Sequence, residues 1–244
     1  TGRTAWLKRY PFAMCGRFAL FASAEELERH FQVPLPFAVT PRYNIAPSQP
    51  VLALATSTDA PEPVWIHFRW GMVPRWEKDP ASGNQMINAR CESLHEKLAF
   101  RSAFRHRRCI LPMSGFYEWA KVGAKRQPYF VKPATDSVMG VAGLWEPWQS
   151  PDGAALTTCT IITTGANATV RPLHPRMVVV LDPATYALWL DPSTPVEALK
   201  TLLRPAPETL LTAYPVGTRV NNPTHDAPLL IEPLSPELTL FEGG

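Results

Sequence analysis

The dipeptide Met14-Cys15 has the clearest chemical potential in this sequence. If Cys15 were the first residue of the mature chain, it would carry a free α-amine two carbons from its thiol. The reference pKa values, about 7.7–8.0 for the amine and about 8.5 for the thiol, leave a reactive fraction of each group near neutrality. The amine would condense with an aldehyde to an imine, and the thiol would close a five-membered thiazolidine with the high effective molarity of an intramolecular step. The pair therefore predicts aldehyde capture, which an internal cysteine cannot perform because its amide nitrogen is not nucleophilic.

Four further polar spots stand beside apolar or glycine-rich sequence: Asn88 and Arg90 in "MINAR", Glu118 in "SGFYEWA", His174 and Arg176 in "RPLHPRMVVVL", and Arg42 and Asn44 in "PRYNIAPSQP". An aromatic neighbourhood would desolvate Glu118 and raise its pKa, as an acid–base catalyst requires. Each spot also has a structural alternative. Asn88 could cap a helix through "ESLHEKLAF". Glu118 could lie on the outer face of a strand, and His174 could be structural.

The elements that must position these residues are mostly strands. "SAEELERHF" predicts an early helix, because Ser23 and Glu26 form a capping-box pair. "VWIHFRW" alternates Val64, Ile66, Phe68 and Trp70 with Trp65, His67 and Arg69, which is strand periodicity. Further short strands are expected in "VLALA", "RCIL", "GFYEWA", "PYFVK", "VMGVAGLW", "TTCTIIT" and "MVVVL". Later helices are expected after Asp182-Pro183 and after Thr194-Pro195. This order predicts one α+β domain with a large, mostly antiparallel, barrel-like sheet and flanking helices.

Charge and composition leave a nucleic-acid partner open. The 244 residues are 45% hydrophobic and carry a net charge of +3, but residues 14–132 hold sixteen Lys/Arg against ten Asp/Glu, and residues 133–244 hold five against eleven. This asymmetry permits one basic face for a polyanion. "FRSAFRHRR" fits either such a face or a solvated helix and turn. Trp65, Trp70 and Trp76, taken singly, fit the core better than a base-stacking role, although aromatic and arginine pairs do bind single strands.

The cysteine spacing argues against metal and disulfide chemistry. Cys15, Cys91, Cys109 and Cys159 lie far apart without a C-x-x-C pair, so we expect no zinc site, no other cofactor, and buried reduced thiols at the last three positions. No apolar run reaches the ~18 residues of a membrane helix, and the first residues do not resemble a signal peptide. The expected location is therefore the cytoplasm, and a monomer is the default.

Six motifs together resemble the SOS-response-associated peptidase family, whose members are also described as abasic-site-processing proteins. They are "MCGRFAL", "RYNIAPSQ", "WGMVPRW", "INARCE", "RRCILPMSGFYEW" and "LHPRMVVVL", and the resemblance covers residues 14–244. It implies a single α+β domain with a basic channel for single-stranded DNA. It also implies that Cys15 forms a thiazolidine crosslink with the aldehyde of an abasic site, which shields the lesion during the DNA damage response.

The resemblance also implies a role for each matching residue. Cys15 is the nucleophile, Asn88 holds the amine or sugar oxygen, Glu118 is the acid–base group, and His174 assists ring opening and proton shuttling. The phosphate contacts would be Arg17, Arg42, Arg90 and Arg176; Asn44 would join them at the DNA, and Pro47 and Trp70 would be wedge or stacking elements. One departure is that Val178 follows Met177 where the family usually has proline.

Residues 1–13 are expected to be an N-terminal extension, followed by the abasic-site-processing domain over 14–244. Either the start codon was assigned too early, which we favour, or a leader is removed. The family's peptidase name suggests self-cleavage, in which Cys15, helped by Glu118 and His174, attacks the preceding carbonyl.

Two other functions remain open. One is a cysteine hydrolase or peptidase that uses Cys15, His174 and Asn88. The other is a noncatalytic single-stranded DNA binding module, which would bind intact and abasic strands alike.

Overall fold

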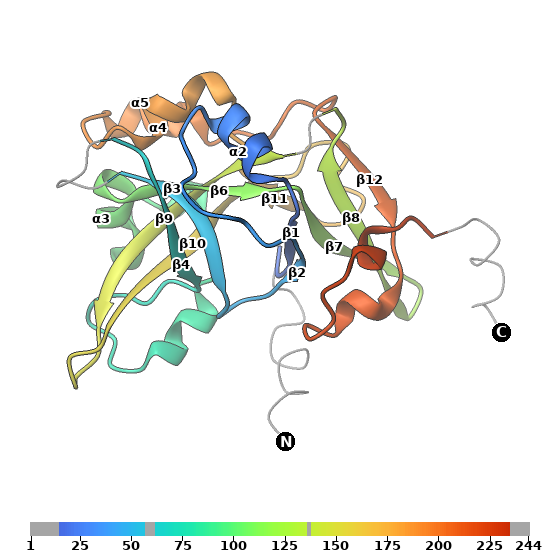
Figure 1. Cartoon of the computed structure of the whole chain (residues 1–244), viewed down its shortest axis with the longest axis horizontal. Coiled ribbons are helices and arrows are strands. Elements are labelled where there is room, and N and C mark those ends of the chain that lie inside the picture. The colour runs from blue at the N-terminus through green and yellow to red at the C-terminus, as the bar shows by residue number, and fades with distance from the viewer. Residues whose placement is uncertain (1–14, 57–61, 136–137, 235–244) are drawn as a thin grey trace.

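Five strands close into a barrel in the computed structural model, which describes residues 15–56, 62–135 and 138–234 (Figure 1). They are β3 (Pro50–Ala55), β4 (Val64–Trp70), β6 (Arg108–Met113), β9 (Met139–Gln149) and β10 (Ala155–Gly165). Pairing runs β4–β3–β6–β9–β10, and the first half of β10 closes the ring by pairing in parallel with the end of β4, with Thr158 opposite Arg69. The short strands β5 (Asn88–Arg90) and β11 (Arg176–Val178) also pair with β10. Their pairing brings two of the polar motifs to one strand.

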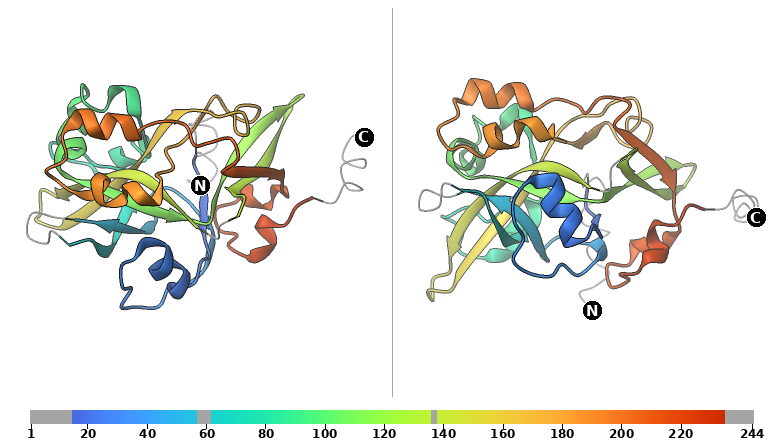
Figure 2. Two further views of the ribbon diagram at one scale, coloured as in Figure 1. Left: turned by 90° about the horizontal axis from the view of Figure 1, so that it is seen from above. Right: turned by 45° about the horizontal axis from the view of Figure 1, so that its top comes forward.

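A second, antiparallel sheet continues directly from the barrel. It has the order β12 (Leu211–Pro215), β8 (Lys125–Pro133), β7 (Gly115–Val122), β1 (Phe18–Leu20) and β2 (Arg42–Ile45). Only Ser114 separates β6 from β7, and its hydroxyl accepts the Phe21 and Ala22 N–H groups. Figure 2 shows the β7–β8 hairpin extending away from the barrel. The second sheet therefore carries Glu118 on β7 and, on β1, the segment that directly follows Cys15.

The C-terminal segment, residues 216–234, covers this second sheet. Val216, Val220 and Leu230 pack with Tyr117 and Phe130 on one face of the sheet. The segment also covers the edge strand β2, because the Asp226 carboxylate accepts the Tyr43 and Asn44 N–H groups. Capping an edge in this way removes a template for unwanted strand pairing.

The helices of the described residues lie on the outside of the barrel (Figure 1). They are α2 (Ala24–Phe31), α3 (Leu98–His106), α4 (Tyr186–Leu190) and α5 (Val196–Leu202), with 3-10 turns at Pro80–Gln85, Cys91–Ser93, Pro183–Thr185, Thr218–Asn221 and Pro228–Ile231. The capping box at Ser23 is confirmed, as are the helical starts after Asp182 and Thr194. The suggestion that Asn88 caps a helix is wrong, because Asn88 lies in β5 and α3 begins ten residues later, at Leu98.

The α+β class with a barrel-like, mostly antiparallel sheet is confirmed, and so are the predicted strands, except that the strand expected in "MVVVL" ends at Val178. One expected strand face is only partly correct. In β4, Phe68 and Trp70 are buried as expected, but Val64 and Ile66 are exposed and Trp65 is buried instead. The reason is that the first half of β4 passes the end of α2, where the Trp65 ring packs edge-on against Phe31 and its indole donates to Val33 O. No helix in the described residues has the length and apolarity to cross a membrane.

Candidate active site

Cys15 and Glu118 lie in direct contact. β1 pairs with β7 so that Phe18 is opposite Phe116, and the Tyr117 N–H donates to Arg17 O at 3.0 Å. This pairing brings the chain before β1 alongside Glu118, and the Cys15 backbone nitrogen donates to Glu118 Oε1 at 2.9 Å. Cys15 is 0% and Glu118 3% exposed. The expectation of a desolvated Glu118 is therefore confirmed, and its placement on an outer strand face is wrong.

Burial controls the charge of both groups. It raises the pKa of Glu118 to about 8, against the smaller opposing effect of the Cys15 N–H hydrogen bond. Burial also raises the pKa of the Cys15 thiol well above its ordinary value, and the Glu118 charge adds to the shift. At neutral pH the thiol is therefore uncharged, and Glu118 is a carboxylic acid that can donate a proton.

Glu118→Gln is expected to stabilise the fold in a pH-dependent way. The folded chain keeps a proton on Glu118 up to about pH 8, whereas the unfolded chain releases it near 4.5. The wild type therefore loses stability between these pH values, by at most about 5 kcal/mol. The variant, whose amide oxygen still accepts the Cys15 N–H, should lack this loss. Calorimetric Tm values at pH 4, 6 and 9 measure the difference between the two proteins, and a difference independent of pH would contradict the assignment.

The backbone at Cys15 is bent toward Glu118. Its φ is +38°, a region that residues with a Cβ rarely occupy. Such a conformation costs about 1–3 kcal/mol and persists only when the surroundings enforce it. The pairing of the next residues with β7 and the Glu118 hydrogen bond supply that enforcement here.

Arg17 and Asn44 clamp the same region to the C-terminal segment. Arg17 Nη1 donates to Asn44 Oδ1 at 3.1 Å and to Val220 O at 2.8 Å. Asn44 is fully buried, and its Nδ2 donates to the carbonyls of Val220, Asn222 and His225. Burial lowers the pKa of Arg17 to about 10, so its guanidinium remains charged at neutral pH.

A second polar group forms along β10. Asn88 and Arg90 of β5 lie opposite Ile161 and Thr163, and Arg176 of β11 lies opposite Gly165. His174 Nδ1 accepts the Arg176 N–H at 3.1 Å. Burial lowers the pKa of His174, and the charges of Arg176 and Arg126 act in the same direction. The His174 ring is therefore neutral at pH 7, and the effect of the Arg126 charge on its pKa indicates that the β7–β8 hairpin lies near it.

Two of the predicted phosphate-binding arginines already hold carboxylates. Arg176 makes a bidentate pair with Glu92 at 2.8 and 2.9 Å, and Arg42 pairs with Asp226 and donates to Gln49. Arg90 is exposed, and no ion pair engages it within the described ranges. A phosphate would meet Arg90 directly but would compete with a carboxylate at Arg42 and Arg176.

The exposure of Trp70 and Trp76 differs, although the sequence predicted a core position for both. Trp70 is 0% exposed, with its indole donating to Ile87 O and its ring against Phe18, so the core interpretation is confirmed for it. Trp76 is 55% exposed, so the core interpretation is wrong there. Its neighbours Pro74, Arg75 and Glu77 are not apolar strand residues, which is the signal that could have identified it. Pro47 lies half-buried in the turn between β2 and β3.

The other cysteines are reduced and separate from Glu118. Cys109 and Cys159 are buried as expected, whereas Cys91 is only partly buried.

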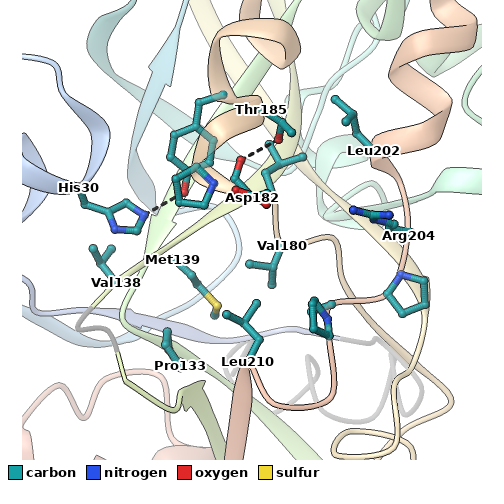
Figure 3. Close-up of a pocket in the computed structure, with 16 residues that line it drawn as sticks. His30, Pro133, Val138, Met139, Val180, Asp182, Thr185, Leu202, Arg204 and Leu210 are labelled. Atoms are coloured by element: carbon teal, nitrogen blue, oxygen red, sulfur yellow. Dashed lines mark hydrogen bonds between the residues drawn. The ribbon is translucent and has the colours of Figure 1, made fainter.

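A cavity of about 280 Å³ lies elsewhere, between α2, α4 and the chain after α5 (Figure 3). His30 and Tyr186, which are hydrogen-bonded at 2.9 Å, line it together with Met139 and Arg204. None of the predicted site residues, all of which are described, is among its lining residues. The cavity is therefore distinct from the Cys15–Glu118 contact.

Comparison with known proteins agrees with the fold and the motifs. A model of the SOS response associated peptidase (SRAP) family matches residues 14–223. Abasic site processing protein YoqW of Bacillus subtilis (strain 168) is 39% identical over 224 residues, which are 90% of this chain and 99% of that protein. Abasic site processing protein HMCES of Mus musculus is 31% identical over 232 residues, covering 79% of this chain and 65% of that protein. A crystal structure of a Bacteroides thetaiotaomicron protein has a TM-score of 0.80 at 22% identity, covering 91% of this chain and 100% of that one.

Proposed function

The chain belongs to the SOS response associated peptidase (SRAP) family, and from this membership we propose that it processes abasic sites in DNA by crosslinking to them through Cys15. The substrate is single-stranded DNA whose abasic sugar has opened to an aldehyde. The product is a thiazolidine that shields the lesion from strand cleavage. The observation that carries the proposal is the 2.9 Å contact between the Cys15 nitrogen and Glu118 Oε1.

The first step forms the carbon–nitrogen bond. With Cys15 at the N-terminus, its neutral amine attacks the aldehyde carbon and yields a carbinolamine. Loss of water then requires a proton on the departing hydroxyl, and the buried Glu118 carboxyl is placed to donate it. The resulting imine places its carbon beside the Cys15 sulfur.

The second step closes the ring. The thiol sulfur bonds to the imine carbon, and its proton passes to the nitrogen, so that aldehyde and cysteine give thiazolidine and one water. A neutral thiol is suited to this order of events, because it does not compete with the amine for the first attack. Burial and the Glu118 charge both keep the pKa of the Cys15 thiol high.

The same thiol argues against the hydrolase alternative. A cysteine nucleophile in hydrolysis is activated by a lowered pKa or an adjacent base. Here the group next to Cys15 is an acidic carboxyl, and His174 is bound to the Arg176 backbone on β11. His174 and Asn88 are better suited to the sugar, as a proton shuttle and a hydrogen-bonding group in the proposed complex.

The proposed DNA contacts rest on charge and exposure. The exposed Arg90 would bind a phosphate directly. Arg17, whose Nη1 already donates to Asn44 and Val220, would do so through its other N–H groups, and Arg42 and Arg176 would join only if their carboxylates are displaced. Trp76, through its exposure, is a better candidate for base stacking than Trp70. Asn44 and Pro47 would shape the turn beside β2 that the strand passes.

Self-cleavage is a proposed route to the free amine when residues precede Cys15. The thiol would attack the carbonyl of residue 14 in an intramolecular acyl shift from nitrogen to sulfur. Glu118 would protonate the nitrogen as the carbon–nitrogen bond breaks and would regain a proton from the thiol, and water would then hydrolyse the thioester. The positive φ of Cys15 and the contact of its nitrogen with Glu118 favour this chemistry.

A crosslinking assay tests the proposed function. Protein whose first residue is Cys15 should form a heat-stable, shifted band with an abasic oligonucleotide and none with the intact strand. Labelling of Cys15 by an acyl probe without DNA would support the hydrolase instead. If the protein binds both strands equally and high salt releases all of the DNA, the result supports the noncatalytic DNA binding module.

A further inference from the structure

α3 presents a row of three cations on its exposed face. Lys97 is the N-cap residue, and Arg101 and Arg105 follow at intervals of four, so all three lie on one side of the helix. In the described ranges, no hydrogen bond or ion pair engages these side chains. Like charges at i and i+4 repel each other and destabilise a helix. The row therefore destabilises α3, and no contact within the described ranges offsets this effect.

The arginines that follow α3, in contrast, have internal partners. Arg107 pairs with the buried Glu146, and Arg108 donates to the carbonyls of Phe104, Arg105, Trp189 and Asp191. The two glutamates of this stretch are occupied as well: Glu92 holds Arg176, and Glu96 contacts His95 at 3.5 Å. Among the residues that the structure describes, Lys97, Arg101 and Arg105 thus have no internal partner for their charges.

The position of α3 relates this row to the proposed DNA path. Arg90 ends β5, the turn Cys91–Ser93 follows, and Lys97 lies seven residues beyond Arg90. Phe100, Ala103 and Phe104 bury the opposite side of α3, which packs on β6 and β9 and holds the row outward. Along the sequence, basic residues therefore recur from Arg90 through Lys97 to the end of α3.

The spacing suits a phosphate backbone. Four residues of helix advance by about 6 Å, so the three cations span about 12 Å. Phosphates of one strand advance by about 3.4 Å each when the bases are stacked, and by more when the strand is extended. Each cation can therefore reach a different phosphate.

We propose that the exposed face of α3 binds the sugar–phosphate backbone of the strand that flanks the abasic site, without reading its bases. This inference rests on the proposed function, because the strand is the one crosslinked at Cys15. It predicts that affinity depends on DNA length, since only a strand that extends beyond the lesion reaches α3.

The test compares the wild type with K97Q/R101Q/R105Q on strands of 7 and 25 nucleotides that contain a central, unreactive tetrahydrofuran site. Each phosphate contact to a single strand contributes about 0.7 to the slope of log K against log salt, so the variant should lose about 2 from that slope on the 25-mer. Its Kd at ~0.1 M salt should rise at least about tenfold on the 25-mer and stay unchanged on the 7-mer. R29Q/K200Q/R204Q, which removes the same charge from α2 and the α5 region, is the matched control.

Equal losses in the two triple variants would overturn the inference, because they would show that only net charge matters. A loss on the 7-mer as large as on the 25-mer would also overturn it. Crosslinking of a 7-mer with a true abasic site tests the proposed function separately, since that reaction does not need α3. Thermal unfolding should give a Tm for the α3 variant equal to or above that of the wild type, because like-charge repulsion has been removed.

Discussion

Cys15→Ala is expected to abolish the heat-stable crosslink to abasic DNA, a loss of at least about 10³-fold. Alanine keeps the α-amine, so an imine can still form and can be trapped by borohydride. Without the sulfur no ring closes, and the imine hydrolyses, because the gain from a positioned intramolecular group is lost. Gel mobility after heating, with and without borohydride, measures both products.

Cys91→Ala is the matched control, since Cys91 is also a reduced thiol but lies beside Glu92, away from Glu118. It should crosslink at the wild-type rate. A heat-stable band from Cys15→Ala without reductant would contradict the proposed product. Intact masses of the two full-length proteins also test self-cleavage, which the Cys15→Ala protein should fail to perform.

Glu118→Gln is expected to slow crosslinking about 10²–10³-fold with an unchanged Kd for DNA, because an amide holds the nitrogen but transfers no proton. The Cys15 nitrogen lies 2.9 Å from Glu118 Oε1, so a free amine and the carboxyl would act on the same reacting atoms. The wild-type rate should rise with pH as the amine loses its proton and fall as Glu118 ionises, its pKa being raised by burial to about 8. The crosslinking rate of the variant should still rise with pH but should not fall at high pH.

Single-turnover rates across pH 5–10 at saturating DNA measure this profile. Glu118→Asp, which keeps the carboxyl but shortens its reach, should retain the bell shape at a reduced rate. An unchanged rate in Glu118→Gln would remove Glu118 from the chemistry.

Local sequence predicted the elements whose signals are local. The Ser23–Glu26 capping box and the apolar runs of the barrel strands appear where they were expected. β1, β2, β5 and β12 were not recognised, because they have three to five residues and are defined by their partners in the sheet. Glu118 was found because its aromatic neighbours predict burial along the same strand.

The parts that failed depend on distant residues. The Asp226 carboxylate that holds Arg42 is 184 positions away, and no local pattern indicates it. The choice between Trp70 and Trp76 likewise depends on which ring other elements cover. The roles at the DNA came from family resemblance and remain predictions.

The clamp between Arg17 and Val220, 203 residues apart, has a consequence for synthesis of the chain. Cys15 and Arg17 leave the ribosome long before β7 and the C-terminal segment that hold this part of the chain have been made. If the amine of Cys15 is free during that interval, its amine and thiol are exposed to small aldehydes in solution. Nothing then restricts the reaction to the aldehyde of an abasic site. Rapid translation and prompt folding would thus preserve the fraction of molecules still able to react with DNA.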